Sequence, residues 1–403
     1  MNLRVARYID RWVGLGVCFV LWAAARLLSA GRMVPALFAT TPAHADAARP
    51  RRVLAIKFYG LGNIAMILPT LAAMKADDPD IEIDFLTLPG NVTLLEQSGL
   101  VTRPLTVEVS GFGDFLGSVL GLYDALRGGD YDAVLDFEQF MKLSGIFAFA
   151  TGASSRVGFN TDGQARGWLY THRVAYADTD HMADIFMRLA LPFGRAVHPA
   201  PHVKIAIDPG DRERALAAAG VAEGEGLVAM HVGTGPNYGK VALKRWDVER
   251  FARLADRLVE TLGVRIVFTG VGEEEGELIR VALAHMEQRD RARSLCDVLT
   301  VGELTGLLQA CAFVVSNDTS VMHLTNLVET PVVAIFGATE PRLYGPRGSS
   351  DLVFYRGLFC SPCLSNYNLK MSRCVDPVCM KQIGVDEVAA GIDARFSTAA
   401  RAV

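Results

Sequence analysis

The sequence has no excess of charge of either sign. Its 403 residues carry 40 Lys and Arg against 44 Asp and Glu, which gives a formal net charge of −4. Binding to nucleic acid depends on cationic side chains that neutralise phosphates, so this balance gives no electrostatic case for a nucleic-acid partner. The sequence has no fixed-period repeat and no low-complexity array. Its length is enough for two or three ordinary domains with full cores.

Long uncharged hydrophobic runs are also scarce. The run at 12–25, WVGLGVCFVLWAAA, ends at Arg26, and it is shorter than the roughly 20 apolar residues that clearly span a bilayer. The first 52 residues hold eight Arg against Asp10 and Asp46. Apolar residues flanked by arginines are typical of a helix that lies in, or shallowly crosses, an anionic membrane surface.

We therefore predict a membrane-associated apolar helix and connector at 1–50, on the inner membrane surface. Two alternatives remain open. One is a signal peptide, although its candidate cleavage site AHA at 43–45 lies about 20 residues beyond the apolar run, farther than in the usual layout. The other is a helix packed on the body of the protein.

Short apolar strands alternate with helical patterns along the rest of the chain. This alternation predicts an α/β fold with parallel sheets and right-handed crossovers. A break with two Pro and Asp-Pro-Gly near 195–220 divides the alternation into two doubly wound halves. We predict Rossmann-like domains at 51–205 and 206–403 that face a cleft, with ligands at the carboxyl ends of the strands. The predicted strands are 53–58, 81–86, 132–137, 226–232, 264–270, 312–318 and 330–337.

The second half contains three stretches that suit a nucleotide. FVVSNDTSVMH, at 313–323, predicts a strand followed by a helix whose N-terminus can bind an anion such as a diphosphate. HVGTGPNYGKVALKRW, at 231–246, is a glycine-rich loop with cations suited to phosphate. FTGVGEEEGELI, at 268–279, places carboxylates where a ribose hydroxyl can be held. Taken singly, each stretch also fits a capped helix, a solvated loop or acidic residues in a first helical turn.

Together these stretches resemble glycosyltransferase family 9, the heptosyltransferases of lipopolysaccharide assembly. The family's D-T-G-x-x-H element stands here as DTSVMH (318–323), followed by TPVVAIFGATEP, and its K-x-W element as KRW (244–246). The opening strand and glycine turn of the family stand here as VLAIKFYGLGN, with Pro69 in the next helix. The resemblance covers roughly 53–390 and implies a GT-B-like, inverting transferase that uses a nucleotide-diphosphate sugar, typically ADP-heptose, and needs no metal for transfer.

The resemblance also assigns roles to individual residues. Thr234 and Lys244 would face the diphosphate, and a glutamate near Glu274 would hold the ribose. Gly60 and Gly62 belong to the acceptor loop. Ser320 stands where the family has Gly, which adds a side chain where a backbone approaches closely. The residues that would surround the phosphates and the donor sugar are Asp318, Thr319, Ser320 and His323.

The family's acidic residue after the first glycine turn is its expected general base, and here that position is Asn63. Inverting transfer needs a group that takes the proton of the acceptor hydroxyl, and a neutral amide cannot do so. Asn63 can orient the acceptor or cap the helix predicted to begin at 64. We therefore name Asp136 and Glu138, which end a predicted strand of the same half, as candidate bases; each also fits a surface or capping role.

The cysteines fall into two groups. Cys18, Cys296 and Cys311 sit inside apolar or helical patterns and read as small buried hydrophobes. Four others follow the spacing C-x2-C-x10-C-x4-C, which in a cytosolic enzyme favours a metal over disulfides. A structural zinc or another thiolate-bound metal, unliganded thiols and disulfides all stay open for this quartet, Cys360, Cys363, Cys374 and Cys379.

Two functions are compatible with the sequence. The first is transfer of a heptose-like sugar from a nucleotide-diphosphate donor to a lipopolysaccharide or other surface-glycan acceptor, at the cytoplasmic face of the inner membrane. The second is a catalytically weak or silent relative that binds a nucleotide sugar as an assembly partner, which Asn63 favours. A nucleotide-sugar epimerase of the same architecture fits less well, because the DTSVMH and FGATEP block matches the transferases.

Overall fold

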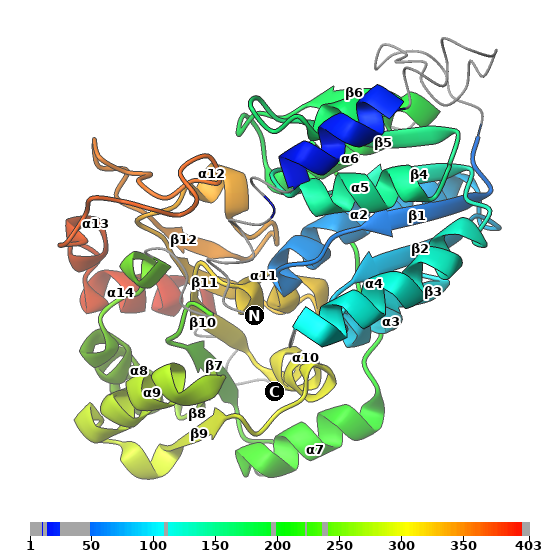
Figure 1. The fold of residues 1–403 in the computed structure, drawn as a ribbon. Helices are drawn as coiled ribbons and strands as arrows, with labels where there is room; N and C mark the ends of the chain where they lie inside the picture. Colours follow the sequence, from blue (N-terminus) through cyan, green and yellow to red (C-terminus); the bar gives the residue numbers. More distant parts are fainter. Residues whose placement is uncertain are drawn as a thin grey trace. The chain divides into compact units, whose positions relative to one another are not determined.

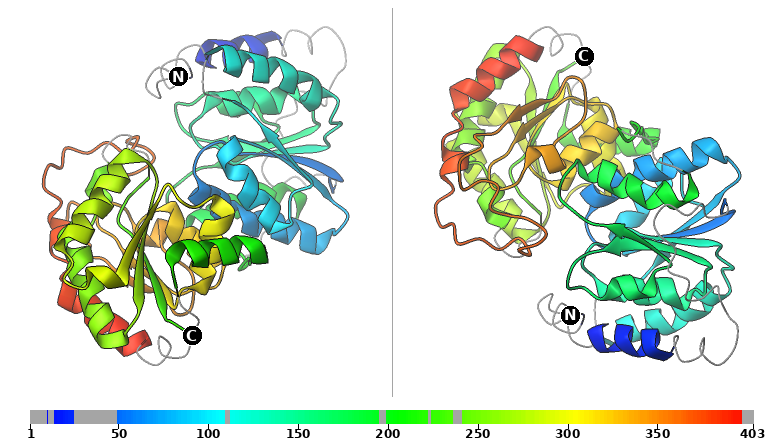
Figure 2. Two further views of the ribbon diagram at one scale, coloured as in Figure 1. Left: turned by 90° about the horizontal axis from the view of Figure 1, so that it is seen from below. Right: turned by 90° about the horizontal axis from the view of Figure 1, so that it is seen from above.

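The computed structural model forms two compact units, Met1–Val203 and Lys204–Val403, shown in Figures 1 and 2. We call them the N-terminal unit and the C-terminal unit. Each has its own six-stranded parallel sheet, and each is described separately below. The structure describes residues 10, 14–24, 49–108, 112–194, 199–221, 224–235 and 241–396.

The sheet of the N-terminal unit has the strand order β3-β2-β1-β4-β5-β6. The buried central strands β1 and β4 read RVLAI and AVLD, near-continuous apolar runs of the kind that a sheet covered on both faces requires. Strand order reverses between β1 and β4, and a ligand site in such a sheet is expected outside the carboxyl ends of these two strands. The strands are β1 (Arg52–Ile56), β2 (Glu82–Thr87), β3 (Arg103–Thr106), β4 (Ala133–Asp136), β5 (Ser155–Asn160) and β6 (His172–Ala175).

Helices cover both faces of this sheet (Figures 1 and 2). Helix α2 contacts α3 and α6, whereas α4 contacts α5. The α4 and α5 side chains join an apolar cluster with strand residues such as Leu54 and Val134. The helices are α2 (Leu61–Asp77), α3 (Val92–Ser98), α4 (Phe112–Arg127), α5 (Lys142–Ala150) and α6 (Met182–Met187), with the 3-10 turns η1 (Pro89–Asn91), η2 (Arg166–Leu169) and η3 (Arg188–Phe193).

The sheet of the C-terminal unit has the order β12-β11-β10-β7-β8-β9. Its order reverses between β7 and β10, so a ligand site is expected beyond their carboxyl ends. The strands are β7 (Leu227–His231), β8 (Arg265–Gly270), β9 (Ala292–Cys296), β10 (Phe313–Asn317), β11 (Val332–Ile335) and β12 (Leu352–Phe354). The helices are α7 (Pro209–Ala219), α8 (Val248–Leu262), α9 (Gly272–His285), α10 (Val301–Ala310), α11 (Ser320–Leu327), α12 (Pro341–Tyr344), α13 (Val378–Lys381) and α14 (Val385–Phe396), with η4 (Val241–Lys244) and η5 (Arg289–Arg291).

The prediction of two parallel, doubly wound sheets is confirmed. Five strands were not predicted: β3, β5, β6, β9 and β12. Four of them are edge strands and β5 lies next to an edge, where one side of the strand is less buried and the apolar run is interrupted. β3, for example, reads RPLT and contains a Pro, which is tolerated on edge strands.

A short helix at 14–24 packs on the N-terminal unit; we call it the docked helix (dark blue in Figure 1). The Asp10 carboxylate, just before it, accepts hydrogen bonds from the backbone N–H of Lys142 at 3.0 and 3.1 Å and of Leu143 at 2.9 Å. Asp10 thereby caps α5, whose N-cap residue Met141 makes no side-chain cap of its own. The ring of Trp22 lies 5.6 Å from that of Trp168.

Within the described part of the chain, no helix is long and apolar enough to cross a membrane. The hydrogen bonds of Asp10 and the contact between Trp22 and Trp168 are what pack the docked helix on its own unit. The predicted membrane association stays a prediction. The candidate cleavage site at 43–45 and most of the connector lie outside the described residues.

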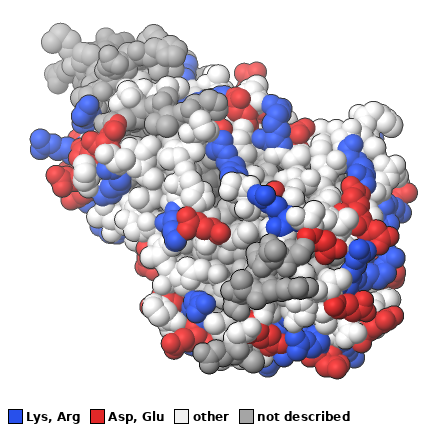
Figure 3. Space-filling view, turned by 180° about the vertical axis from the view of Figure 1, so that it is seen from behind, with Lys and Arg blue, Asp and Glu red and all other residues white. Residues whose placement is uncertain are grey.

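The described charges that are visible on the face drawn in Figure 3 are mixed: Lys and Arg alternate there with Asp and Glu. This mixture agrees with the near-balanced composition.

Candidate functional site

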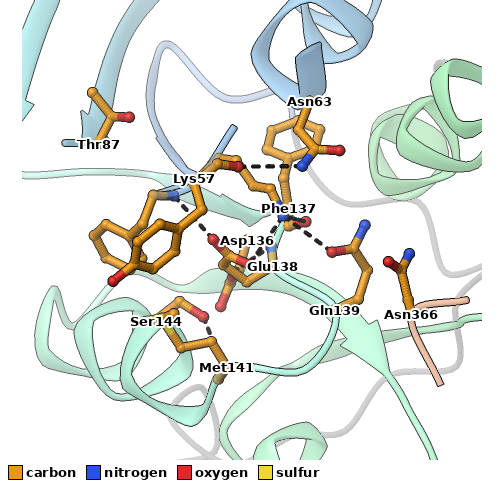
Figure 4. Close-up of polar contacts among 12 residues, drawn as sticks. Lys57, Asn63, Thr87, Asp136, Phe137, Glu138, Gln139, Met141, Ser144 and Asn366 are labelled. Atoms are coloured by element: carbon orange, nitrogen blue, oxygen red, sulfur yellow. Dashed lines mark hydrogen bonds and ion pairs between the residues drawn. The ribbon is translucent and has the colours of Figure 1, made fainter. Parts of the chain in front are cut away.

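The first polar cluster lies at the carboxyl edge of the N-terminal sheet. β1 and β4 run in parallel with Ile56 opposite Asp136, so the residues that follow them, Lys57 and Glu138, come together. Lys57 Nζ donates to Glu138 Oε2 at 2.9 Å and to Gln139 Oε1 at 3.0 Å. Glu138 Oε1 accepts from the backbone N–H of Phe58 at 2.9 Å. The result is a buried ion pair fixed to two neighbouring strands (Figure 4).

Asn63 lies above this edge, in the first turn of α2. The helix begins at Leu61 after Gly60, and no side chain makes an N-cap hydrogen bond; the predicted capping role of Asn63 is therefore wrong. Its Nδ2 instead donates to the carbonyl of Tyr59 at 3.2 Å, while its amide oxygen points away from that contact (Figure 4). Gly60 has φ +92°, a value that a residue with a Cβ rarely adopts, and Gly62 is buried inside α2.

Asp136 occupies a different environment from Glu138. Its side chain and that of Arg166 are both 0% exposed, and Arg166 Nη2 lies 2.7 Å from Asp136 Oδ2. Tyr170 donates its hydroxyl to the same oxygen at 2.5 Å, and the backbone N–H of Glu138 donates to Oδ1 at 3.0 Å. Burial raises the pKa of Asp136, although Arg166 and Tyr170 partly offset it. A carboxylate enclosed in this way is suited to holding β4 and η2 together.

The second cluster lies at the carboxyl edge of the C-terminal sheet, beyond β10. Lys244, the last residue of η4, donates from Nζ to the Asp318 carbonyl at 2.6 Å and to Asp318 Oδ2 at 3.2 Å. Thr339, which follows β11, donates its hydroxyl to the same carboxylate oxygen at 2.6 Å. Burial alone raises the pKa of Asp318, but Lys244, Thr339 and other nearby groups outweigh it, and the pKa lies below its ordinary value.

The start of α11 is formed by the residues after Asp318. Thr319 is the N-cap residue but makes no capping hydrogen bond with its side chain; its hydroxyl lies 3.1 Å from that of Ser316. Asn317 turns away from α11, accepting from the backbone N–H of Trp246 at 2.9 Å and donating to the Val232 carbonyl at 3.0 Å. Ser320, half-buried, is the first helical residue. In the described structure, therefore, no side chain caps the positive end of α11.

His323 is the fourth residue of α11 and is buried. Its charge, when present, acts on the Asp318 carboxyl and lowers that pKa, after the larger effects of burial, Lys244 and Thr339. The structure therefore brings together three of the predicted donor residues, Lys244, Asp318 and His323, around one edge of the sheet.

Thr234 and Glu274 are joined through Arg245, which had no predicted role of its own. Arg245 Nε donates to Thr234 Oγ1 at 3.1 Å, and its Nη1 lies 2.7 Å from Glu274 Oε1. The next residue, Glu275, is buried and accepts from the backbone N–H of Gly235 at 2.8 Å and of Val271 at 2.9 Å. Glu275 therefore fixes the loop, whereas Glu274 is half-exposed and paired with Arg245. Lys240 of this loop lies outside the described residues.

Gly233 shows why this loop needs glycine. A Cβ at that position would lie 1.9 Å from Glu275 Oε1, so any side chain would displace the carboxylate that holds the loop. The glycine-rich character of the stretch at 231–240 thus has a local packing cause at this position.

The cysteine quartet lies between β12 and α14. Burial raises the pKa of Cys379, and the charges of the other three raise it further, Cys363 first, so these three thiols lie within electrostatic reach of Cys379. Yet among the described residues no group of three or more His, Cys, Asp or Glu is arranged to hold a metal ion. The side chains as placed do not form the predicted zinc site, and the metal stays a prediction. All seven cysteines are free, so the disulfide alternative is wrong.

Residues 119–371 match the family described as Glycosyltransferase family 9 (heptosyltransferase). The chain belongs to glycosyltransferase family 9. It is 24% identical over 314 residues to lipopolysaccharide heptosyltransferase 1 of Escherichia coli, covering 75% of this chain and 92% of that protein. It is 34% identical over 105 residues to lipooligosaccharide heptosyltransferase 2 of Haemophilus influenzae, which covers 26% of this chain and 30% of that relative.

The fold agrees with that of a solved heptosyltransferase. A structure titled E. coli ADP-heptose lps heptosyltransferase II superposes with a TM-score of 0.70 at 20% identity, covering 86% of this chain and 98% of that one. This likeness establishes a GT-B-like fold.

Sequence reasoning about this family 9 chain missed several polar residues. Lys57 carried a signal, because it is a charge directly after an apolar strand at a carboxyl edge. Arg245 stood inside the quoted KRW element and Thr339 inside FGATEP. Arg166 and Tyr170 gave no signal in the sequence. Only the folded chain brings them to Asp136, which lies 34 residues before Tyr170.

Proposed function

We propose that this protein is an inverting glycosyltransferase that moves a heptose-like sugar from a nucleotide-diphosphate donor, of the ADP-heptose kind, to a lipopolysaccharide or other surface glycan. The observation that supports it best is the edge beyond β10, where Lys244 is held by Asp318 beside the uncapped N-terminus of α11. An ammonium and free backbone N–H groups at the positive end of a helix are suited to a diphosphate.

The two charged residues of this edge have different parts in the proposal. The low pKa of Asp318 keeps its carboxylate ionised, and an ionised carboxylate repels phosphate. Asp318 therefore positions Lys244 and accepts hydrogen bonds from hydroxyls of the donor sugar, while Lys244 and the start of α11 bind the diphosphate. Glu274, held by Arg245 and half-exposed, accepts from the ribose. Thr234, Thr319, Ser320 and His323 complete the donor site.

The general base is proposed to be Glu138 rather than Asp136. Asp136 is sealed from solvent by Arg166 and Tyr170, so an acceptor hydroxyl cannot reach it without opening that cluster. Glu138 lies at the carboxyl edge itself, beside Lys57. Asn63 would orient the acceptor through its amide. Because the curated relatives are transferases by name, transfer is favoured over the silent, binding-only alternative.

The proposed acceptor is a glycolipid, and the docked helix suits contact with the cytoplasmic face of the inner membrane. Cys18 on this helix is buried, whereas Phe19 is 52% and Val20 63% exposed, together with Leu15 and Val17. One side of the helix is thus packed and the other presents apolar side chains in a segment rich in Arg, the composition of an interfacial helix.

Binding to vesicles that contain anionic lipids tests this contact. Inserting two half-exposed apolar side chains contributes roughly 2 kcal/mol, so the Phe19→Ser/Val20→Ser variant should bind more than tenfold more weakly. The control is Val271→Ser, which alters an apolar residue that is 74% exposed elsewhere on the chain. Equal vesicle binding by the double variant and the wild type would refute the contact.

Thermal stabilisation by a panel of nucleotide sugars tests the donor proposal. A ligand at 100 times its Kd adds about 2.7 kcal/mol to the stability of the folded state. We expect a rise in Tm with ADP-heptose and ADP that is reduced in Lys244→Met. No shift with any nucleoside-diphosphate sugar would refute the proposal.

A further inference from the structure

The two peptide groups on either side of the Glu138 Cα are both held by one buried ion pair. The backbone N–H of Glu138 donates to Asp136 Oδ1 at 3.0 Å (Figure 4). The backbone carbonyl of Glu138 accepts from Nη1 of Arg166. Nη2 of the same guanidinium lies 2.7 Å from Asp136 Oδ2. These contacts form a closed ring around the backbone of the proposed general base.

Tyr170 fixes the guanidinium within this ring. Its hydroxyl donates to Asp136 Oδ2 at 2.5 Å and accepts from Nε of Arg166 at 2.9 Å. The Tyr170 ring is itself tightly enclosed. A Cβ on Gly158 of β5 would lie 2.4 Å from Tyr170 Cζ, and a Cβ on Gly145 of α5 would lie 3.2 Å from the hydroxyl oxygen. The aromatic ring that supports the guanidinium therefore has little room to move.

The side chain of Glu138 is held from the opposite direction. Its two carboxylate oxygens accept from Lys57 Nζ and from the backbone N–H of Phe58, both at 2.9 Å, and both donors directly follow β1. The backbone of Glu138 is instead held by Arg166, which belongs to η2. The carboxylate is thus fixed between two parts of the unit that are distant in the sequence.

We propose that Arg166 is a positioning residue for Glu138, acting through the Glu138 carbonyl and through Asp136. The proposal rests on the proposed function, in which Glu138 is the general base. A base must lie within hydrogen-bond reach of the proton that it takes, and a small displacement can cost much of the rate. The Arg166 side chain is 0% exposed, so it acts through Glu138 and touches no substrate.

Stability alone does not account for a buried ion pair at this place. Apolar side chains of similar volume often stabilise a protein as well as a buried ion pair does. What an apolar side chain cannot supply is a directed donor for the Glu138 carbonyl. The guanidinium supplies this donor and binds the Asp136 carboxylate at the same time.

A double-mutant cycle in the full chain tests this role. Arg166→Lys keeps a positive charge for Asp136, but a single ammonium does not reproduce the planar fork of the guanidinium. Transfer from ADP-heptose to a lipopolysaccharide-core acceptor is measured well below the unfolding temperature of each variant. We expect kcat to fall about tenfold or more, with ADP affinity unchanged. In a Glu138→Gln background no base remains to be positioned, so the same change should lower kcat by less than about twofold.

Arg156→Lys is the matched control. Arg156 is another buried arginine of the N-terminal unit, and it donates to the carbonyls of Leu169 and Ala153 at 2.9 and 2.5 Å. Its replacement should lower the Tm but leave the kcat of the folded protein unchanged. Tyr170→Phe removes only a hydroxyl and serves as the second variant if Arg166→Lys does not fold. It should lower kcat in the wild-type background and leave it unchanged in Glu138→Gln.

The outcomes separate this inference from the proposed function. An equal loss of kcat in both backgrounds would show a general structural effect, and an unchanged kcat in folded Arg166→Lys or, failing that, in Tyr170→Phe would show no effect. Either result would overturn the inference and leave the proposed function standing. Normal transfer by Glu138→Gln would also overturn it, because the base would then be another group. If the wild-type chain transfers no sugar, the proposed function fails and this inference fails with it.

Discussion

Replacement of Glu138 separates its proposed catalytic role from its part in the fold. In Glu138→Ala, Lys57 would remain as an unpaired charge, because both side chains are buried, 8% and 4% exposed, and lie 2.9 Å apart. Breaking a buried pair from one side costs about 3–5 kcal/mol, so this variant can lose activity simply by unfolding. Glu138→Gln keeps the shape of the side chain and one oxygen that can accept from Lys57 or Phe58. It should lower the free energy of unfolding by only about 1–3 kcal/mol.

The assay therefore measures stability first and transfer second. Urea unfolding of Glu138→Gln and of the double variant Lys57→Met/Glu138→Gln should show that the double change restores part of the lost stability, since no charge is then left unpaired. Transfer by folded Glu138→Gln should fall about 10²-fold or more, the usual effect of losing a general base. The double variant should stay equally slow, because its carboxylate is still missing.

The pH profile completes this test. A carboxylate base gives kcat/KM a limb that falls at low pH, and this limb should be absent from the residual activity of Glu138→Gln. A rate within about threefold of the wild type, with the low-pH limb intact, would refute the assignment of the base. Recovery of activity in the double variant would show that Glu138 acts only as the partner of Lys57.

Further predictions concern the other groups named above. Asn63→Ala should reduce transfer less than Glu138→Gln does, and Asn63→Asp should raise it if the family's acid still fits; a dead Asn63→Ala beside a normal Glu138→Gln would reverse the two roles. Asp318→Asn should weaken ADP-heptose binding about tenfold. Because the pKa of Asp318 is lowered in the folded protein, the carboxylate contributes stability that is lost at low pH, so the difference in unfolding free energy between wild type and Asp318→Asn should shrink as the pH falls below about 4. Asp10→Ala should lower the free energy of unfolding by about 0.5–2 kcal/mol, the value of a helix cap, and an unchanged urea midpoint would contradict the docking of the N-terminal helix. The predicted zinc requires about one equivalent per chain by elemental analysis, lost in Cys360→Ser/Cys363→Ser; metal-free protein with readily titratable thiols in the quartet would rule it out.

The sequence allowed the architecture to be predicted because buried parallel strands are apolar throughout and end in polar or glycine residues. This is how β1, β4, β7 and β10 were found, and with them the two sheet edges that carry the candidate site residues. The edge strands were missed because half-buried strands such as β3 lack that signature. Boundaries also shifted: α2 was expected to begin at 64, but it begins at Leu61 and includes Asn63.

The roles of individual carboxylates were harder to predict, because they depend on partners distant in the sequence. Asp136 and Glu138 are two residues apart and looked equivalent. The fold gives one of them Arg166 and Tyr170, and the other Lys57. Likewise, no local pattern indicated that Asp10 caps α5, more than a hundred residues later.

We propose that this chain transfers a sugar from a nucleoside-diphosphate donor to a glycolipid. Mass spectrometry of a lipopolysaccharide-core acceptor, incubated with the full chain and ADP-heptose, tests it most directly. We expect the acceptor to gain the mass of one heptosyl residue, which is a heptose less one water, while ADP appears in equal amount, and we expect neither with Lys244→Met. An unmodified acceptor and no ADP, from wild-type protein that binds ADP-heptose by calorimetry, would contradict transfer and leave a binding protein in its place.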